Sequence, residues 1–229
     1  MYKIFEGKTK DVYQLDDGNY KLIFKDDMTG SDGEFDPGAN SVGLTVEGAG
    51  RAGLDMSVYY FKLLEEKGYP THFISAEENS MTVKKAYPFG EGLEVICRYK
   101  ALGSFIRRYG GSISEGTALN AVVEMTLKDD KRGDPLINED ALVAMGILKS
   151  GEYSEIRSLT REICEVIKND LAAGNLELCD IKLEFGKDES GKIMLIDEIS
   201  GGNMRVQENG KSVSPMDLSK RVLKSIKEA

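Results

Sequence analysis

Carboxylates are concentrated in one stretch near the C-terminus, residues 179–200, which reads CDIKLEFGKDESGKIMLIDEIS. The stretch predicts a β-hairpin, in which alternation places Asp180 and Glu184 on one face of the first strand. On the returning strand, alternation places Asp197 and Glu198 on opposite faces. Carboxylates on neighbouring strands can hold Mg²⁺ while phosphate oxygens and water complete its coordination. The alternative is an exposed strand face with Lys–Glu pairs across the strands.

The loop that follows the hairpin favours the ligand-binding interpretation. It reads SGGNMR over residues 200–205, so its glycines let the backbone come close to a bound molecule. Arg205 ends the loop with a guanidinium that can bind an anion through two parallel hydrogen bonds. Carboxylates, a glycine loop and an arginine within nine residues are more than an edge strand needs.

Residues 6–13, EGKTKDVY, predict a second anion site near the N-terminus. Gly7 between two strands allows the backbone to approach a phosphate, and the spacing of Lys8 and Lys10 points both ammonium groups to one side. Such a segment can cover nucleotide phosphates, as glycine-rich loops and strand lysines do in kinases. The alternative is a hairpin whose lysines are solvated.

Two further stretches carry cations that could bind phosphate. Residues 97–111, CRYKALGSFIRRYGG, place Arg98 on a strand and Ser104 at the start of a short helix. A helix start with a hydroxyl and a guanidinium favours a phosphate site. A serine N-cap with solvent-facing arginines is the alternative. Lys128 leaves a strand into the acidic loop 126–135, where it contacts a nucleotide phosphate or belongs to a polar turn.

The elements that must position these residues predict an α+β protein with antiparallel sheets and flanking helices. Strands are expected through residues 1–25, and the glycine-, aspartate- and serine-rich residues 26–51 are expected to form a long loop. The glycine- and proline-rich residues 87–92 separate two lobes, 1–88 and 89–229, with the active site in the cleft between them. Helices are expected at 55–67, from about 138, at 153–173 and at 215–229.

Composition limits the function classes that fit the chain. The 229 residues are 41% hydrophobic and carry a net charge of -9, which argues against nucleic-acid or membrane binding. The start of the chain has no signal-peptide pattern. Cys97, Cys164 and Cys179 fit neither a disulfide framework nor a zinc site, which indicates reduced thiols in the cytoplasm. His72 is the one histidine and is expected to be structural, so histidine-based nucleophilic catalysis is disfavoured.

These stretches, taken in order, resemble the SAICAR synthetase family of purine biosynthesis. The segments EGKTKDVY, FKDD, EVICRYKALGSFIRRYG, LKDDKRGDP, DIKLEFG and DEIS carry the resemblance, which spans roughly residues 2–205. It implies a two-lobed SAICAR synthetase/ATP-grasp-like fold. It also implies an ATP- and Mg²⁺-dependent ligase that joins L-aspartate to the carboxylate of 5-amino-1-(5-phosphoribosyl)imidazole-4-carboxylate.

The resemblance also implies roles for individual residues. Lys10, Lys128 and Asp197 are expected to take part in catalysis, and Glu184 with Asp197 to hold Mg²⁺. The expected ATP contacts are Gly7, Lys8, Thr9, Lys10, Val12, Lys84 and Lys128. The expected contacts to the ribonucleotide are Arg98, Ser104, Asp180 and Arg205.

The chain departs from the family pattern around the acceptor substrates. Residues 47–55 read EGAGRAGLD where the family commonly has a KGxxNN-like run, and the loop after DEIS reads GGN where the family often has an aspartate. A ligase acting on another acid or amine is therefore an alternative, and a non-catalytic nucleotide-binding protein is a third. The family resemblance also suggests a homodimer with small-molecule substrates.

Overall fold

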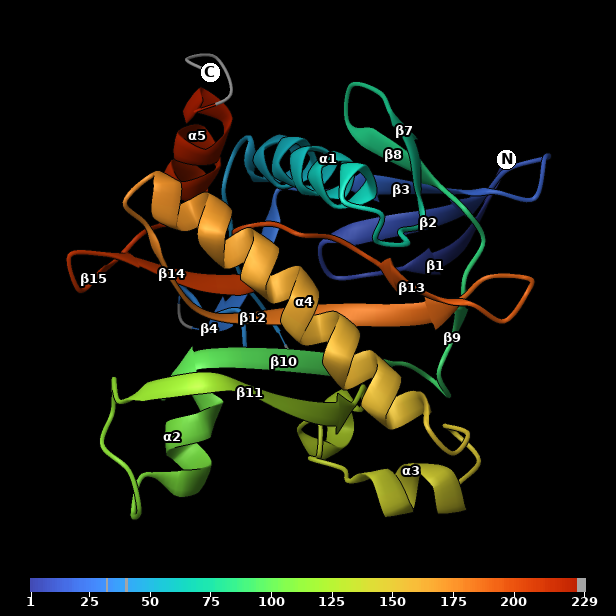
Figure 1. Cartoon of the computed structure of the whole chain (residues 1–229). Coiled ribbons are helices and arrows are strands. Elements are labelled where there is room, and N and C mark those ends of the chain that lie inside the picture. Colours follow the sequence, from blue (N-terminus) through green and yellow to red (C-terminus); the bar gives the residue numbers. More distant parts are fainter. Residues whose placement is uncertain (32, 40, 226–229) are drawn as a thin grey trace.

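Two antiparallel sheets and five α-helices make up most of the chain (Figure 1). The computed structural model describes residues 1–31, 33–39 and 41–225. The observed mixture of helices and antiparallel strands confirms the predicted α+β class. The predicted C-terminal helix occupies Pro215–Ser225, and its expected continuation over 226–229 lies outside the described residues.

The first sheet is built almost entirely from the N-terminal third of the chain. Its strand order is β1-β2-β3-β8-β7, and every neighbouring pair is antiparallel. The register places Lys10 opposite Phe24 where β2 meets β3. The strands are β1 (Tyr2–Glu6), β2 (Lys10–Gln14), β3 (Tyr20–Phe24), β7 (Phe73–Ala76) and β8 (Ser80–Val83).

The second sheet follows the order β11-β10-β12-β14-β15, and β13 and β9 also pair with β12. The predicted hairpin is present, because β12 and β13 pair with Glu184 opposite Ile196. The strands are β9 (Tyr87–Pro88), β10 (Leu93–Lys100), β11 (Ala118–Leu127), β12 (Glu177–Lys187), β13 (Ile193–Ile196), β14 (Met204–Glu208) and β15 (Lys211–Ser212).

The segment predicted as a long loop, 26–51, is instead largely structured. It forms a three-stranded antiparallel sheet, with β4 (Asp27–Ser31) between β5 (Glu34–Phe35) and β6 (Val42–Thr45). These strands are short and rich in glycine, so the sequence lacks the β-branched alternation that marks a strand. Close packing explains the two strand glycines, because a Cβ at Gly30 would overlap the Glu34 carbonyl group and a Cβ at Gly43 would overlap the Gly30 backbone.

The helices follow the sequence prediction closely, except that α1 begins earlier than expected. α1 spans Ala49–Glu66 because Asp26 accepts hydrogen bonds from the Gly48 and Gly50 amides and so caps its first turn. The remaining helices are α2 (Ser104–Tyr109), the 3₁₀ turn η1 (Asp130–Arg132), α3 (Glu139–Ala144), α4 (Glu152–Ala173) and α5 (Pro215–Ser225).

One hydrophobic core joins the sheets and helices, and it leaves one face of β12 for polar residues. α4 lies across the second sheet and packs on β10, β11 and β12 (Figure 1). Ile181, Leu183 and Phe185 of β12 enter the core, as the predicted alternation requires. The side chains between them face away from α4, toward the first sheet. None of the helices within the described residues is long and apolar enough to cross a membrane.

Candidate active site

A cavity of about 440 Å³ lies between the two large sheets and brings together most of the predicted nucleotide and metal residues. Its walls come from the β1–β2 turn, from β4 and the start of α1, from β12, and from the loop between β13 and β14. The predicted residues that line it are Gly7, Lys8, Thr9, Lys10, Val12, Lys128, Glu184 and Asp197. The sequence-predicted anion segment and carboxylate hairpin therefore face one space.

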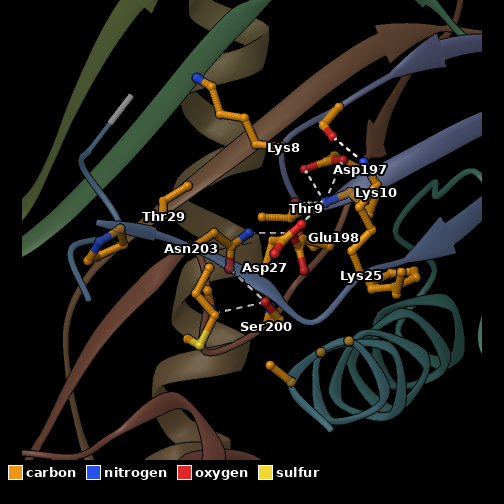
Figure 2. Close-up of a pocket in the computed structure, with 18 of the residues that line it drawn as sticks. Lys8, Thr9, Lys10, Lys25, Asp27, Thr29, Asp197, Glu198, Ser200 and Asn203 are labelled. Atoms are coloured by element: carbon orange, nitrogen blue, oxygen red, sulfur yellow. Dashed lines mark hydrogen bonds and ion pairs between the residues drawn. The ribbon is translucent and has the colours of Figure 1, made fainter. Parts of the chain in front are cut away.

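Lys10 is the most buried of the lysines that line this cavity, and it lies beside Asp197 and Glu198 (Figure 2). Its side chain is 9% exposed, and its ammonium lies 3.2 Å from Asp197 Oδ1 and 2.5 Å from Glu198 Oε1. Burial alone would lower the pKa of Lys10, but the two carboxylates outweigh burial and raise it above its usual value. Burial opposes ionisation of Asp197 in the same way, and Lys10 with Lys128 still holds the pKa of Asp197 below its usual value.

The prediction that Asp197 and Glu198 lie on opposite faces is wrong. β13 ends at Ile196, and Asp197 adopts a left-handed backbone conformation with φ of 67°. This conformation interrupts the alternation of side chains, so both carboxylates line the cavity and both contact Lys10. Glu198 is a site residue that the sequence analysis missed, because a strand pattern carries no sign of a single left-handed residue.

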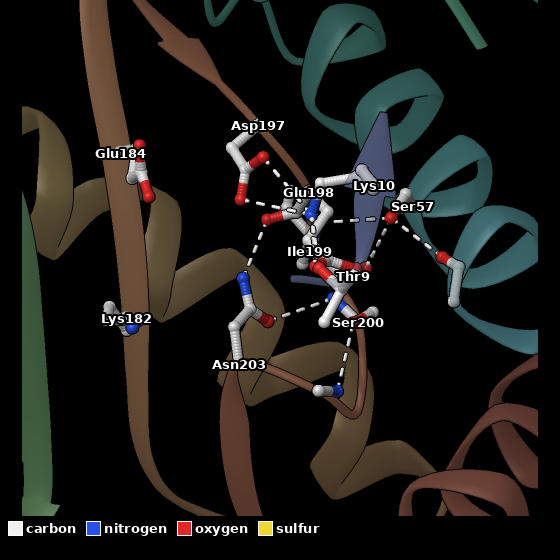
Figure 3. Close-up of polar contacts among 12 residues, drawn as sticks. Thr9, Lys10, Ser57, Lys182, Glu184, Asp197, Glu198, Ile199, Ser200 and Asn203 are labelled. Atoms are coloured by element: carbon white, nitrogen blue, oxygen red, sulfur yellow. Dashed lines mark hydrogen bonds and ion pairs between the residues drawn. The ribbon is translucent and has the colours of Figure 1, made fainter. Parts of the chain in front are cut away.

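Two buried side chains, Ser57 and Asn203, hold the loop that carries these carboxylates (Figure 3). Ser57 of α1 accepts a hydrogen bond from the Ile199 amide at 3.2 Å. Asn203 donates to the Glu198 carbonyl oxygen at 2.7 Å and accepts from the Ser200 amide at 3.0 Å. The loop is therefore bonded to α1 through Ser57 and is held internally by Asn203, which fixes the carboxylates relative to the cavity.

His72 supports the same loop from the other side and confirms its predicted structural role. Its Nε2 lies 3.2 Å from the Asp197 carbonyl oxygen, and its ring lies tilted by 60° against the Phe61 ring at a centroid distance of 5.2 Å. Burial lowers the pKa of His72 to about 4. The ring is therefore neutral at pH 7 and donates a hydrogen bond from Nε2 to the carbonyl oxygen.

Glu184 faces the same cavity from β12, and its carboxylate is 2.7 Å from the Lys128 ammonium. Burial and the negative charge of Asp197 raise the pKa of Glu184 above its usual value. Two carboxylates that repel each other in one cavity favour a cation between them. Within the described ranges, no cluster of three histidine, cysteine or acidic side chains could hold a metal alone. Glu184 and Asp197 fit Mg²⁺ by their chemistry, because this ion binds one or two carboxylates and takes its remaining ligands from phosphates and water.

Lys8 and Lys25 occupy the mouth and the wall of the cavity. Figure 2 shows the Lys8 side chain apart from Lys10. The Lys8 ammonium pairs with Asp130 of η1 at 2.7 Å, across the cleft. Lys25, which the sequence analysis did not assign, donates to the Gly7 carbonyl oxygen and pairs with Asp11, both at 2.8 Å. Lys25 thus fastens the β1–β2 turn to β3.

Lys84 is the predicted nucleotide contact that does not line the cavity. It follows β8, and its ammonium donates to the Thr71 carbonyl oxygen at 3.2 Å. Its main-chain amide donates to the His72 carbonyl oxygen at 2.7 Å. In this structure Lys84 therefore ties β8 to the segment before β7, and a nucleotide contact stays a prediction.

The four residues predicted to bind the ribonucleotide lie together in a neighbouring cavity of about 100 Å³. Arg98 is its most buried member, with a side chain 2% exposed. Its guanidinium lies 2.6 Å from Glu124, donates to Ser104 Oγ at 2.8 Å and lies 3.5 Å from Asp180. Arg205 Nη1 donates to both Asp180 oxygens at 3.0 and 3.1 Å.

This geometry excludes the serine N-cap of the alternative interpretation and buries Arg98, whereas the Arg107 side chain is 59% exposed. Gly103, not Ser104, is the N-cap of α2, and no side-chain hydrogen bond caps the helix. Gly103 has φ of 53°, and a Cβ there would lie 2.7 Å from Arg205 Nη2. Only glycine allows the chain this conformation and this close approach to the guanidinium.

The two cavities adjoin, because four residues line both of them. The shared residues are Pro37, Glu94, Lys182 and Asn203. Lys182 pairs with Glu94 at 2.6 Å, and Glu94 also accepts a hydrogen bond from Thr126. A molecule whose phosphate occupied the arginine side would therefore extend toward Lys182 and the carboxylates of the larger cavity.

The comparisons with known proteins point to one family. The family model described as SAICAR synthetase matches residues 3–228. The phosphoribosylaminoimidazole-succinocarboxamide synthase of Clostridium tetani is 55% identical over 226 residues, which cover 97% of this chain and 100% of that protein. The protein of the same name from Finegoldia magna is 39% identical and covers 90% of this chain and 85% of its own length.

Solved structures show the same fold. A SAICAR synthetase in complex with ADP superposes with a TM-score of 0.86 at 31% identity, covering 98% of this chain and 97% of that one. The phosphoribosylaminoimidazole-succinocarboxamide synthase of Ehrlichia chaffeensis superposes with a TM-score of 0.85 at 26% identity, covering 99% and 97%. These matches confirm the fold and the family that the sequence motifs predicted.

Proposed function

This chain belongs to the SAICAR synthetase family, and we propose that it is an ATP-dependent carbon–nitrogen ligase of purine biosynthesis. It joins L-aspartate to the carboxylate of 5-amino-1-(5-phosphoribosyl)imidazole-4-carboxylate and forms SAICAR, ADP and phosphate. One observation carries the proposal. A cavity with lysines and two carboxylates adjoins a second cavity lined by arginines, so a nucleotide and a phosphorylated acid can meet between them.

The chemistry of this reaction matches the groups that line the cavity. A carboxylate is a poor electrophile, and phosphorylation by ATP converts it to an acyl phosphate that the aspartate amine can attack. Phosphoryl transfer of this kind depends chiefly on positioning and on cationic stabilisation of the phosphates. Lys10 and Lys128 supply fixed positive charge here, and neither a histidine nor a cysteine nucleophile is required.

We assign Glu184 and Asp197 to Mg²⁺, which neutralises phosphate charge when it is bound. Lys10 holds Asp197 ionised, and Lys128 balances the charge of Glu184 in the absence of the metal. Gly7, Lys8, Thr9 and Val12 cover the nucleotide from the β1–β2 segment. We also propose that Lys84, which follows β8, contacts the nucleotide.

We assign the second cavity to the ribonucleotide. Ser104 and Arg205 bind its 5′-phosphate with support from Arg98, and Asp180 lies toward the imidazole. The carboxylate then extends to the shared wall at Lys182. The similar structure in complex with ADP supports nucleotide binding by this chain, and we assign the nucleotide to the adjoining cavity. We also propose a cytoplasmic homodimer with small-molecule substrates.

An ADP-release assay tests the proposed function. The purified chain is incubated with ATP and Mg²⁺, with the imidazole carboxylate ribonucleotide and L-aspartate added together or omitted singly. We expect ADP release at full rate only when both are present. ADP release that is unchanged on omitting either acceptor would exclude this reaction. Restoration by a different acid or amine alone would instead identify a ligase with other acceptors.

A further inference from the structure

Asp36 places a carboxylate on the arginines of the second cavity. It lies just after β5, and its Oδ1 is 2.6 Å from Arg205 Nη2. Its Oδ2 is 3.9 Å from Arg107 Nη1, and the Gly38 amide donates to Oδ1 at 2.8 Å. This carboxylate belongs to the turn that follows β5 of the small sheet, whereas Arg205 and Arg107 belong to β14 and α2.

The other arginines of this cavity are already bonded to its own wall. The Arg98 guanidinium contacts Glu124, Ser104 and Asp180, and the Arg108 guanidinium lies 2.7 Å from Glu124. These pairs join β10, β11, β12 and α2, which all belong to one side of the cavity. On the side of the cavity that faces the Asp36–Ala39 turn, the guanidinium groups are therefore those of Arg107 and Arg205.

Those two groups are held differently from Arg98. Arg205 uses Nη1 for Asp180 and turns Nη2 to Asp36, and Arg107 has a side chain 59% exposed with a long contact to the same carboxylate. A Cβ built at Gly38 would lie 3.5 Å from Arg205 Nη2 and 3.9 Å from Arg107 Nη2. The backbone of the turn thus stands directly against both guanidinium groups.

We propose that Arg107 and Arg205 form the outer half of the phosphate subsite, and that Asp36 occupies it as an internal anion until the substrate phosphate replaces it. This inference rests on the proposed function. A phosphate monoester carries up to two negative charges and three acceptor oxygens, whereas Asp36 carries one charge and two oxygens. The exchange moves the Asp36–Ala39 turn away from the arginines. It also lets Arg107 contact the phosphate directly, whereas its present contact with Asp36 is 3.9 Å long.

Competition with Asp36 reduces the apparent affinity for the phosphate group, because only the displaced fraction of molecules can bind it. The proposed exchange is therefore tested by measuring ligand affinity and not catalytic rate. Asp36→Asn removes the charge and keeps an oxygen for the Gly38 amide. Glu34→Gln on β5 is the matched control, since it changes the net charge equally on an exposed side chain of the same sheet.

Isothermal titration of the full chain with the imidazole carboxylate ribonucleotide, and separately with inorganic phosphate, measures the effect. We expect Asp36→Asn to bind both about fivefold to tenfold more tightly than Glu34→Gln does, within the usual range of coupling between sites. We expect Arg107→Gln to weaken both by a similar factor in the Asp36→Asn background. Equal or weaker binding by Asp36→Asn would overturn the proposal, as would an Arg107→Gln variant with unchanged affinities.

The two ligands separate this inference from the proposed function. Tighter phosphate binding by Asp36→Asn, with no binding of the ribonucleotide to any variant, would reject the assigned substrate and support the exchange of anions. Ribonucleotide binding that is the same in Asp36→Asn and Glu34→Gln would retain the substrate and reject the exchange.

Discussion

The neutral imidazole of His72 lies 3.2 Å from the main-chain carbonyl oxygen of Asp197, the left-handed residue that carries a proposed metal ligand. Burial lowers the pKa of His72 to about 4, below its value of 6.5 in an unfolded chain. Between these two values the unfolded chain binds more protons than the folded chain, so the free energy of unfolding must fall as the pH falls.

We therefore expect the wild type to lose roughly 3 kcal/mol more stability between pH 6.5 and pH 4 than His72→Gln does. Glutamine keeps a donor for the carbonyl oxygen and does not titrate. Urea denaturation at several pH values, followed by circular dichroism, measures both curves. Parallel curves for the two proteins would mean that His72 is not held neutral by burial.

Asp197→Asn should reduce ADP formation by at least about 100-fold, as removal of a central electrostatic group does. Asparagine tolerates the left-handed conformation, so the free energy of unfolding should change little. Steady-state ADP release and urea denaturation give the two quantities. Glu189→Gln in the exposed turn of the same hairpin is the control and should retain activity. A folded Asp197→Asn enzyme with full turnover would remove Asp197 from the metal site.

Removal of Mg²⁺ with EDTA should abolish ADP formation, and added Mg²⁺ should restore it. Glu184→Gln should raise the Mg²⁺ concentration for half-maximal activity by at least about tenfold, because the site loses one of two carboxylates. Glu177→Gln, an exposed carboxylate on the same strand, is the control. A Mg²⁺ titration of each variant measures this, and identical midpoints would exclude Glu184 as a ligand.

Arg98→Ala should lower the free energy of unfolding by about 3 to 5 kcal/mol, because it leaves Glu124 and Asp180 buried without their central cation. Arg108→Ala is a matched control, since Arg108 contacts the same Glu124 with a side chain that is 29% exposed. For that variant we expect a loss below about 1 kcal/mol. Urea denaturation compares them, and equal losses would contradict a stabilising role specific to Arg98.

The sequence was sufficient to predict which segments form the site, because motif residues such as Lys10 and Glu184 lie on regular strands. Alternation along β12 correctly placed Lys182 and Glu184 on the cavity face and Leu183 in the core. Regular elements transmit this information, since their periodicity fixes the direction of each side chain.

The parts that escaped prediction depend on irregular backbone or on contacts distant in sequence. Glu198 faces the cavity because of one left-handed residue before it. Asp36 reaches Arg205 across 169 positions from a segment whose short, glycine-rich strands resemble a loop. The pairing of Lys8 with Asp130 likewise follows from how the two sheets approach each other, which no local pattern encodes.

The contact between Lys10 and Asp197 also has a consequence for protein synthesis. The two residues are 187 positions apart, so a ribosome adding 5 to 20 residues per second needs roughly 10 to 40 s to make the second after the first. Throughout that interval the N-terminal sheet carries its lysine without the carboxylates that neutralise it. The Mg²⁺ site proposed at Glu184 and Asp197 is therefore complete only after residue 197 has been added.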